Sequence, residues 1–70
     1  YNDLGNYKQA IEDYSRAIEI KPDYAMAYFN RSIAYNRLGH NNLAVDDLKM
    51  AAKLGDEHAK NVLKRNRISW

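Results

Sequence analysis

The sequence contains no cysteine, a single proline and only three glycines in 70 residues. The absence of cysteine excludes a disulfide framework, a cysteine-based zinc site and a cysteine nucleophile. The scarcity of proline and glycine, the residues that most often interrupt regular structure, favours a helical protein. Because one core in a chain this short supplies only about 3–5 kcal/mol, we expect helix packing or self-association to add stability.

Charge of one sign and long apolar runs are also scarce. Eleven Lys and Arg stand against nine Asp and Glu, a net charge of +2, far below the density of a dedicated nucleic-acid binder. No apolar run reaches the ~18 residues of a membrane span, and no charged-then-apolar leader opens the chain. We therefore expect a folded cytoplasmic protein, too small for an ordinary enzyme pocket and its scaffold.

What the sequence does contain is an internal repeat. Shifting the chain by 34 residues aligns seven identical pairs, which are Tyr1 with Tyr35, Asn2 with Asn36, Leu4 with Leu38, Gly5 with Gly39, Ala10 with Ala44, Asp13 with Asp47 and Ala17 with Ala51. The same shift continues more weakly, pairing Ala25 with Ala59, Tyr28 with Val62, Phe29 with Leu63 and Arg31 with Arg65. A period of this length indicates one structural unit used twice.

Four helices are predicted between the turn signals, because apolar residues recur there at three- and four-residue spacing. We expect them over residues 7–20, 24–38, 42–54 and 57–67. Pro22 ends the first helix, and Gly39 and Gly55 end the second and third. The predicted N-caps are Asn6 with Gln9 as its capping-box partner, Asp23, His40 and Asp56. The links are short, so successive helices should pack antiparallel.

This helix-turn-helix period resembles the tetratricopeptide repeat. The matching landmarks are Leu4, Gly5, Tyr7, Ala10, Tyr14, Ala17 and Pro22 in the first copy, and Tyr28, Tyr35, Leu38, Gly39, Ala44, Leu48 and Ala51 in the second. The resemblance implies an all-α fold, a short solenoid of stacked antiparallel helix-turn-helix hairpins, with Gly5 and Gly39 where the chain reverses. Arg31, Ser32 and Asp56 depart from the usual leucine, glycine and proline, and residues 51–59 also resemble the Sel1-type repeat.

The alignment divides a single domain, residues 1–70, into an incomplete first repeat (1–23), a full second repeat (24–55) and a C-terminal capping helix (56–70). Only residues 1–4 of the first repeat's opening helix remain. The helix over 7–20 therefore lacks the partner that would cover Tyr14 and Ala17. Since at least three repeats are normally needed for a stable stack, we expect either a piece of a longer solenoid or a homo-oligomer formed through this face.

The resemblance also implies a function, because tetratricopeptide arrays are non-catalytic scaffolds that bind a peptide or partner helix in a concave groove. The implied partner-binding residues are Met26, Phe29, Asn30, Ile33, Arg37, Lys60 and Lys64. In chaperone-binding members, Lys, Asn and Arg residues clamp the C-terminal carboxylates of a peptide, and Asn30, Lys60 and Lys64 stand at matching positions. The alternatives are a solvated helix face for the two lysines and internal packing for Phe29 and Ile33.

Catalytic and metal-binding chemistry finds little support in the sequence. His40 and His58 have no further ligands at metal spacing, no serine has a histidine alongside it, and no glycine-rich phosphate loop occurs. We expect no catalytic residue, no metal and no cofactor. The basic cluster at residues 64–67 leaves one more alternative, weak binding to nucleic acid or another acidic surface, although cations at a helix C-terminus also simply stabilise the helix.

Overall fold

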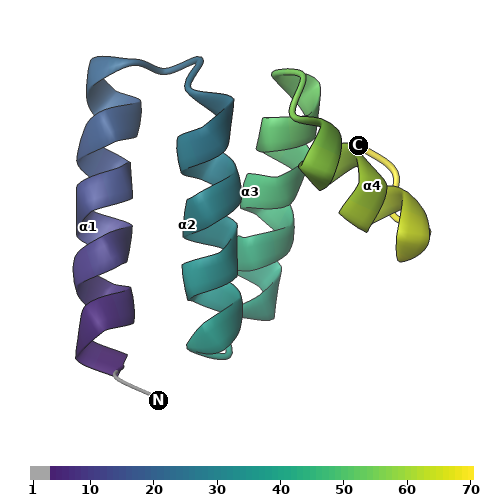
Figure 1. Ribbon diagram of the computed structural model, residues 1–70. Helices are drawn as coiled ribbons and strands as arrows, with labels where there is room; N and C mark the ends of the chain where they lie inside the picture. The colour runs from purple at the N-terminus through teal and green to yellow at the C-terminus, as the bar shows by residue number, and fades with distance from the viewer. Residues whose placement is uncertain (1–3) are drawn as a thin grey trace.

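The computed structural model describes residues 4–70, and its regular secondary structure in that range is helical. The helices are α1 (Leu4–Ile20), α2 (Ala25–Arg37), α3 (Asn41–Lys53) and α4 (Glu57–Arg65). Figure 1 shows α1, α2 and α3 side by side as antiparallel neighbours, with α2 in the middle and α4 inclined against α3 at the end away from α1. The predicted all-α stack of hairpins is confirmed.

The helix ends follow from local backbone chemistry. Gly39 and Gly55 adopt left-handed φ values of 85° and 103°, which glycine tolerates because it has no Cβ. After each glycine, the next backbone N–H returns to the last turn of the helix, from His40 to Tyr35 O and from Asp56 to Ala51 O, both at 2.9 Å. This pairing satisfies carbonyls that would otherwise lack partners. The predicted ends at both glycines are therefore confirmed.

The core is built mostly from small side chains. Its buried apolar members are Ala27, Ala34, Ala44, Ala51, Ala52, Ala59 and Leu63. Small residues let helix backbones approach closely, and larger side chains then fill the gaps between the helices. The partly buried residues packed against the cluster around Leu63 are Tyr28, Phe29, Leu48 and Ile68.

Arg31 joins three helices within this scaffold. Its Nε and Nη2 each donate a 2.7 Å hydrogen bond to the carboxylate of Asp47 on α3, and its Nη1 donates to Ser15 Oγ on α1 at 3.1 Å. The guanidinium carbon also lies 5.6 Å from the ring centre of Tyr28 and 5.7 Å from that of Tyr35. A two-point pair of this kind fixes the relative position of α2 and α3.

The start of the first helix was predicted wrongly. Helix α1 begins at Leu4, so Gly5 and Asn6 lie inside it instead of forming a chain reversal and an N-cap. Gly39, the counterpart of Gly5 in the repeat, instead takes a left-handed backbone that closes the hairpin between α2 and α3. Gln9 donates its side-chain amide to Asp13 at 3.2 Å, not to a capping box. The predicted remnant of a preceding helix otherwise lies in residues 1–3, outside the described residues.

Two other boundaries differ from the predictions. The N-cap of α2 is Tyr24, one residue after the predicted Asp23. Helix α4 ends at Arg65 and not at Arg67, because Arg67 takes a left-handed φ of 57°. That turn lets Ile68 N donate to Leu63 O at 2.8 Å and places the Ile68 side chain on the core. Burial of Ile68 thus replaces a further turn of helix.

The other two predicted caps are at the right positions. Asp56 precedes α4 and accepts a 2.9 Å hydrogen bond from Ala59 N. His40 precedes α3 but makes no side-chain capping bond.

None of the helices in residues 4–70 has the length and apolar character needed to cross a membrane.

Candidate functional site

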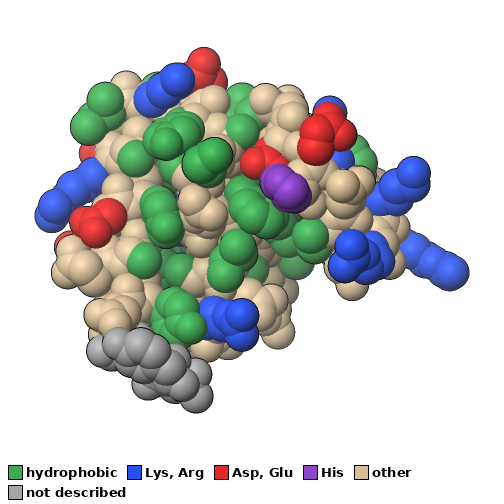
Figure 2. All heavy atoms as spheres, viewed as in Figure 1, with side chains coloured by type: hydrophobic (Ala, Val, Ile, Leu, Met, Phe, Trp, Pro, Cys, Tyr) green, Lys and Arg blue, Asp and Glu red, His purple; other side chains and the backbone are tan. Residues whose placement is uncertain are grey.

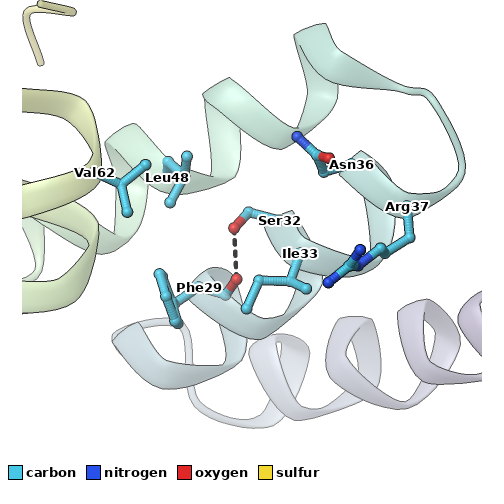
Figure 3. A pocket seen from close by; sticks show the side chains of 7 residues that line it. All are labelled: Phe29, Ser32, Ile33, Asn36, Arg37, Leu48 and Val62. Atoms are coloured by element: carbon cyan, nitrogen blue, oxygen red, sulfur yellow. Dashed lines mark hydrogen bonds between the residues drawn. The ribbon is translucent and has the colours of Figure 1, made fainter. Parts of the chain in front are cut away.

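A hollow of about 330 Å³ lies where α2 meets α3 and α4. Five of its lining residues come from α2, and α3 and α4 contribute one each. They are Phe29, Ser32, Ile33, Asn36, Arg37, Leu48 and Val62. Figure 3 shows Leu48 and Val62 next to each other, across the hollow from Phe29. Phe29, Ile33 and Arg37 of α2 line the same hollow because residues four apart on a helix share one face.

The chemistry of this hollow is apolar in the middle and polar at one end. Ile33 keeps 42% of its surface exposed, although it is a large apolar side chain. Ser32 is buried, and its hydroxyl donates to the carbonyl oxygen of Phe29, so it is already satisfied. Arg37 is exposed and forms no ion pair within residues 4–70. A ligand here would meet an apolar surface beside a free positive charge.

A second hollow of about 170 Å³ adjoins the first at Ile33, which lines both. It lies between α1 and α2. Its lining consists of Tyr7, Ala10, Tyr14, Asn30, Ile33 and Ala34. We call the two hollows together the groove. Figure 2 shows apolar side chains gathered over the first three helices in this view of the molecule.

The structure places the predicted partner-binding residues unevenly. Phe29, Ile33 and Arg37 line the first hollow, and Asn30 lines the second. Met26, Lys60 and Lys64 line neither hollow. Met26 is 58% exposed at the start of α2, Lys60 pairs with Glu57 at 3.4 Å, and Lys64 is exposed on α4.

Several lining residues were missed at the level of sequence. Leu48 and Val62 come from other helices, and their place in the groove depends on how α3 and α4 pack. The 34-residue shift does pair Val62 with Tyr28, and that pairing could have assigned Val62 to the inner face of α4. Phe29 both lines the hollow and packs on the core, and its ring centre lies 5.9 Å from that of His58. The packing role of Phe29 is therefore present in the structure, and its contact with a partner stays a prediction.

The hydrogen bonds that the Arg31 guanidinium donates to Asp47 raise the pKa of Arg31 above its usual value, against the opposing effect of burial. Arg31 is thereby held as a structural cation. Among the described residues, no three His, Asp or Glu side chains gather closely enough to hold a metal ion.

Comparison with known proteins decides the family. A family model described as a TPR repeat matches residues 1–39, more than half of the chain. The chain belongs to the tetratricopeptide-repeat family. It is 36% identical over 55 residues to small glutamine-rich tetratricopeptide repeat-containing protein 2 of Mycosarcoma maydis. It is 38% identical over 60 residues to serine/threonine-protein phosphatase 5 of Homo sapiens. No solved structure matches it significantly.

These matches cover most of this tetratricopeptide-repeat chain but little of the relatives. The alignments include 79% and 86% of the chain, yet only 16% and 12% of the two relatives. A third relative, small glutamine-rich tetratricopeptide repeat-containing protein beta of Homo sapiens, is 43% identical over 42 residues, which is 14% of its length. The shared segment is thus a helical-repeat module, and the matches support a role in protein–protein interaction.

Proposed function

We propose that this chain is a non-catalytic module that binds another polypeptide in the groove along α2. The observation that carries the proposal is Ile33, a large apolar side chain that lines both adjoining hollows and keeps 42% of its surface exposed. A large apolar side chain in a concave surface is the usual anchor point for a peptide or an amphipathic helix. The family membership supports the same class of function.

The lining also favours one chemical type of partner. Phe29, Leu48 and Val62 offer an apolar surface to one buried side chain, and Arg37 offers a charge at its edge. An apolar residue followed by a carboxylate would match both features, because a free guanidinium binds carboxylates in two-point geometry. The carboxylate clamp of Asn30, Lys60 and Lys64 stays a prediction, as do Met26 in partner binding and weak nucleic-acid binding by residues 64–67.

The test uses peptides selected from a random display library against the 70-residue chain. We expect Ile33→Asp to weaken their binding by at least about tenfold, because a charge then occupies the apolar contact. Leu43→Asp is the matched control, since Leu43 is 47% exposed on α3 and lines neither hollow. Phe29→Asp is a poorer probe, because Phe29 also packs on the core and its replacement should lower the stability of the chain as well.

The binding constants of the two variants decide the outcome. Equal affinities for Ile33→Asp and the unaltered chain would contradict groove binding. A loss for Leu43→Asp of the same size would place the contact elsewhere. An Arg37→Glu variant should reduce affinity chiefly for selected peptides that carry a carboxylate, because it replaces attraction by repulsion.

A further inference from the structure

The first hollow, between α2, α3 and α4, contains a hydroxyl that can accept a hydrogen bond but has no hydrogen left to donate. Ser32 lines this hollow and is only 2% exposed. Its hydroxyl donates to the carbonyl oxygen of Phe29, three residues earlier on α2 (Figure 3). A serine hydroxyl has one hydrogen and two acceptor lone pairs, and no group in residues 4–70 donates to this oxygen. A ligand in the hollow can therefore donate to Ser32 but cannot accept from it.

The side chains around this acceptor are apolar. Ile33, Leu48 and Val62 form the middle of the hollow. An aliphatic side chain seated among them would cover the Ser32 oxygen and leave it with no donor in place of solvent, which costs free energy. The lining therefore favours a ligand that is largely apolar and still carries one hydrogen-bond donor.

An aromatic ring forms one wall of the same hollow. Phe29 packs on the core cluster, and its ring centre lies 5.9 Å from that of His58 with the two planes inclined by 32°. These contacts hold the Phe29 ring in place, so a second ring that packs on it does not have to order it first. Aromatic pairs in offset or edge-on contact also gain more than their buried area alone supplies. The wall therefore favours a ring over a branched aliphatic side chain.

The charge at the end of the hollow adds a requirement on the neighbouring residue of the ligand. Arg37 is exposed and forms no ion pair within the described part of the chain. It follows Ser32 by five residues, a rise of ~7.5 Å along a helix. An extended peptide covers that distance in about two residues. A carboxylate about two positions from the seated ring would thus reach the guanidinium.

We propose that the first hollow seats a tyrosine or tryptophan of a partner peptide, with the ring donor bonded to Ser32 Oγ and an acidic residue about two positions away paired with Arg37. Both side chains combine an apolar ring, which packs on Phe29, with one O–H or N–H donor. Charge complementarity at Arg37 supports the acidic neighbour. The inference rests on the proposed groove function and narrows it to one class of peptide.

A double-substitution experiment tests the hydrogen bond. One peptide selected against the 70-residue chain is prepared with tyrosine, tryptophan, phenylalanine or leucine at its anchor, the apolar position whose change to alanine weakens binding most. Calorimetric titration should show the tyrosine and tryptophan forms binding at least about fivefold more tightly than the other two, because only they donate to Ser32. In Ser32→Ala, tyrosine and phenylalanine forms should agree within about twofold. Equal affinities for these two forms in the unaltered chain, or a preference that survives in Ser32→Ala, would overturn the proposal.

A second serine supplies the matched control. Ser69 is exposed and lines neither hollow, so Ser69→Ala should keep the full preference for tyrosine over phenylalanine. Ser32→Ala should retain the helical circular dichroism of the unaltered chain, because alanine is well suited to a helix interior. A preference lost equally in both variants would contradict a bond to Ser32.

The acidic neighbour is tested with Arg37→Gln. This variant should bind the peptide at least about threefold more weakly, and should bind a form of the peptide with the acid changed to its amide within about twofold of the unaltered chain. Equal losses for both peptide forms would overturn the pairing with Arg37.

The Ile33→Asp variant separates two kinds of failure. If Ile33→Asp weakens binding but the tyrosine, phenylalanine and leucine forms bind alike, the groove binds peptides without this preference and only the present inference is overturned. If Ile33→Asp binds as tightly as the unaltered chain, groove binding itself is contradicted and the inference is overturned with it.

Discussion

At the scale of single residues, Arg31 carries a charge where the repeat usually carries a leucine. The substitution is tolerated because Asp47, only 6% exposed, and Ser15 supply partners, and because two tyrosine rings flank the guanidinium. A buried charge is costly unless it is paired and hydrogen-bonded. Each of the two charges therefore depends on the other, because either one alone would be an unpaired charge in a nearly buried place.

Changing one partner should be much worse than changing both. We expect Arg31→Leu to lower the free energy of unfolding by about 3–5 kcal/mol, because it leaves the Asp47 carboxylate buried without a partner. Arg31→Leu with Asp47→Leu should be near neutral or stabilising, as apolar side chains replace the pair. Urea unfolding followed by circular dichroism measures both. A double variant as unstable as the single one would contradict this account.

The exposed ion pair between Arg16 and Glu12 serves as the control. It spans 3.8 Å with side chains 71% and 63% exposed, so Arg16→Leu should change stability by less than about 0.5 kcal/mol.

The pH dependence of the Arg31 pair has a definite sign. Asp47 raises the pKa of Arg31 in the folded state, so its stabilisation is complete below the usual arginine pKa. It is lost only when pH rises through the folded value.

At the scale of helices, three left-handed residues end three of the four helices in residues 4–70, and one of them is not glycine. Gly39 and Gly55 adopt positive φ without strain, whereas Arg67 does so at 57° with a Cβ. The same return hydrogen bonds follow all three, the one after Arg67 running from Ile68 to Leu63. Arg67 therefore sits in a conformation that glycine would occupy at lower free energy.

Substitutions at Arg67 and at Gly39 should change the free energy of unfolding in opposite directions. Arg67→Gly is expected to raise the free energy of unfolding by about 0.5–1 kcal/mol, because it relieves the left-handed strain. Gly39→Ala should lower it by about 1 kcal/mol. No heavy atom lies within 4 Å of a Cβ built at Gly39, so that loss reports backbone conformation alone. Thermal unfolding of both variants checks the pair, and a destabilised Arg67→Gly would contradict it.

Helix ends set by a local residue were predictable, and those set by packing were not. Pro22, Gly39 and Gly55 act on their own backbone, so the sequence alone located the turns. Gly5 matches Gly39 in the repeat yet is helical, so the repeat position alone does not decide the backbone conformation of a glycine. Arg67 carries no local sign of a left-handed turn. Its conformation follows from the burial of Ile68 on the core.

The groove was predictable to a similar extent. Phe29, Ile33 and Arg37 share one face of α2 by spacing, and the structure brings them to one hollow. Leu48 and Val62 complete it only through the packing of other helices. Lys60 was expected at the groove from its matching position, but it pairs with Glu57 and lines neither hollow. Spacing identifies a face, while tertiary packing decides which residues surround a cavity.

At the scale of the whole molecule, the row of helices creates two kinds of surface. The groove follows α2 and presents apolar side chains with Arg37 at one end. Figure 2 shows lysine and arginine side chains gathered toward the α4 end.

The central claim is that the groove binds a polypeptide, and amide chemical-shift mapping tests it most directly. The isotope-labelled chain is titrated with one library-selected peptide while its backbone resonances are followed. The account predicts that the largest shifts centre on the groove residues Phe29, Ile33, Arg37 and Val62, with little change at Leu43 and Met50, which are exposed outside it. Largest shifts at Leu43 and Met50, with the groove resonances unmoved, would contradict it.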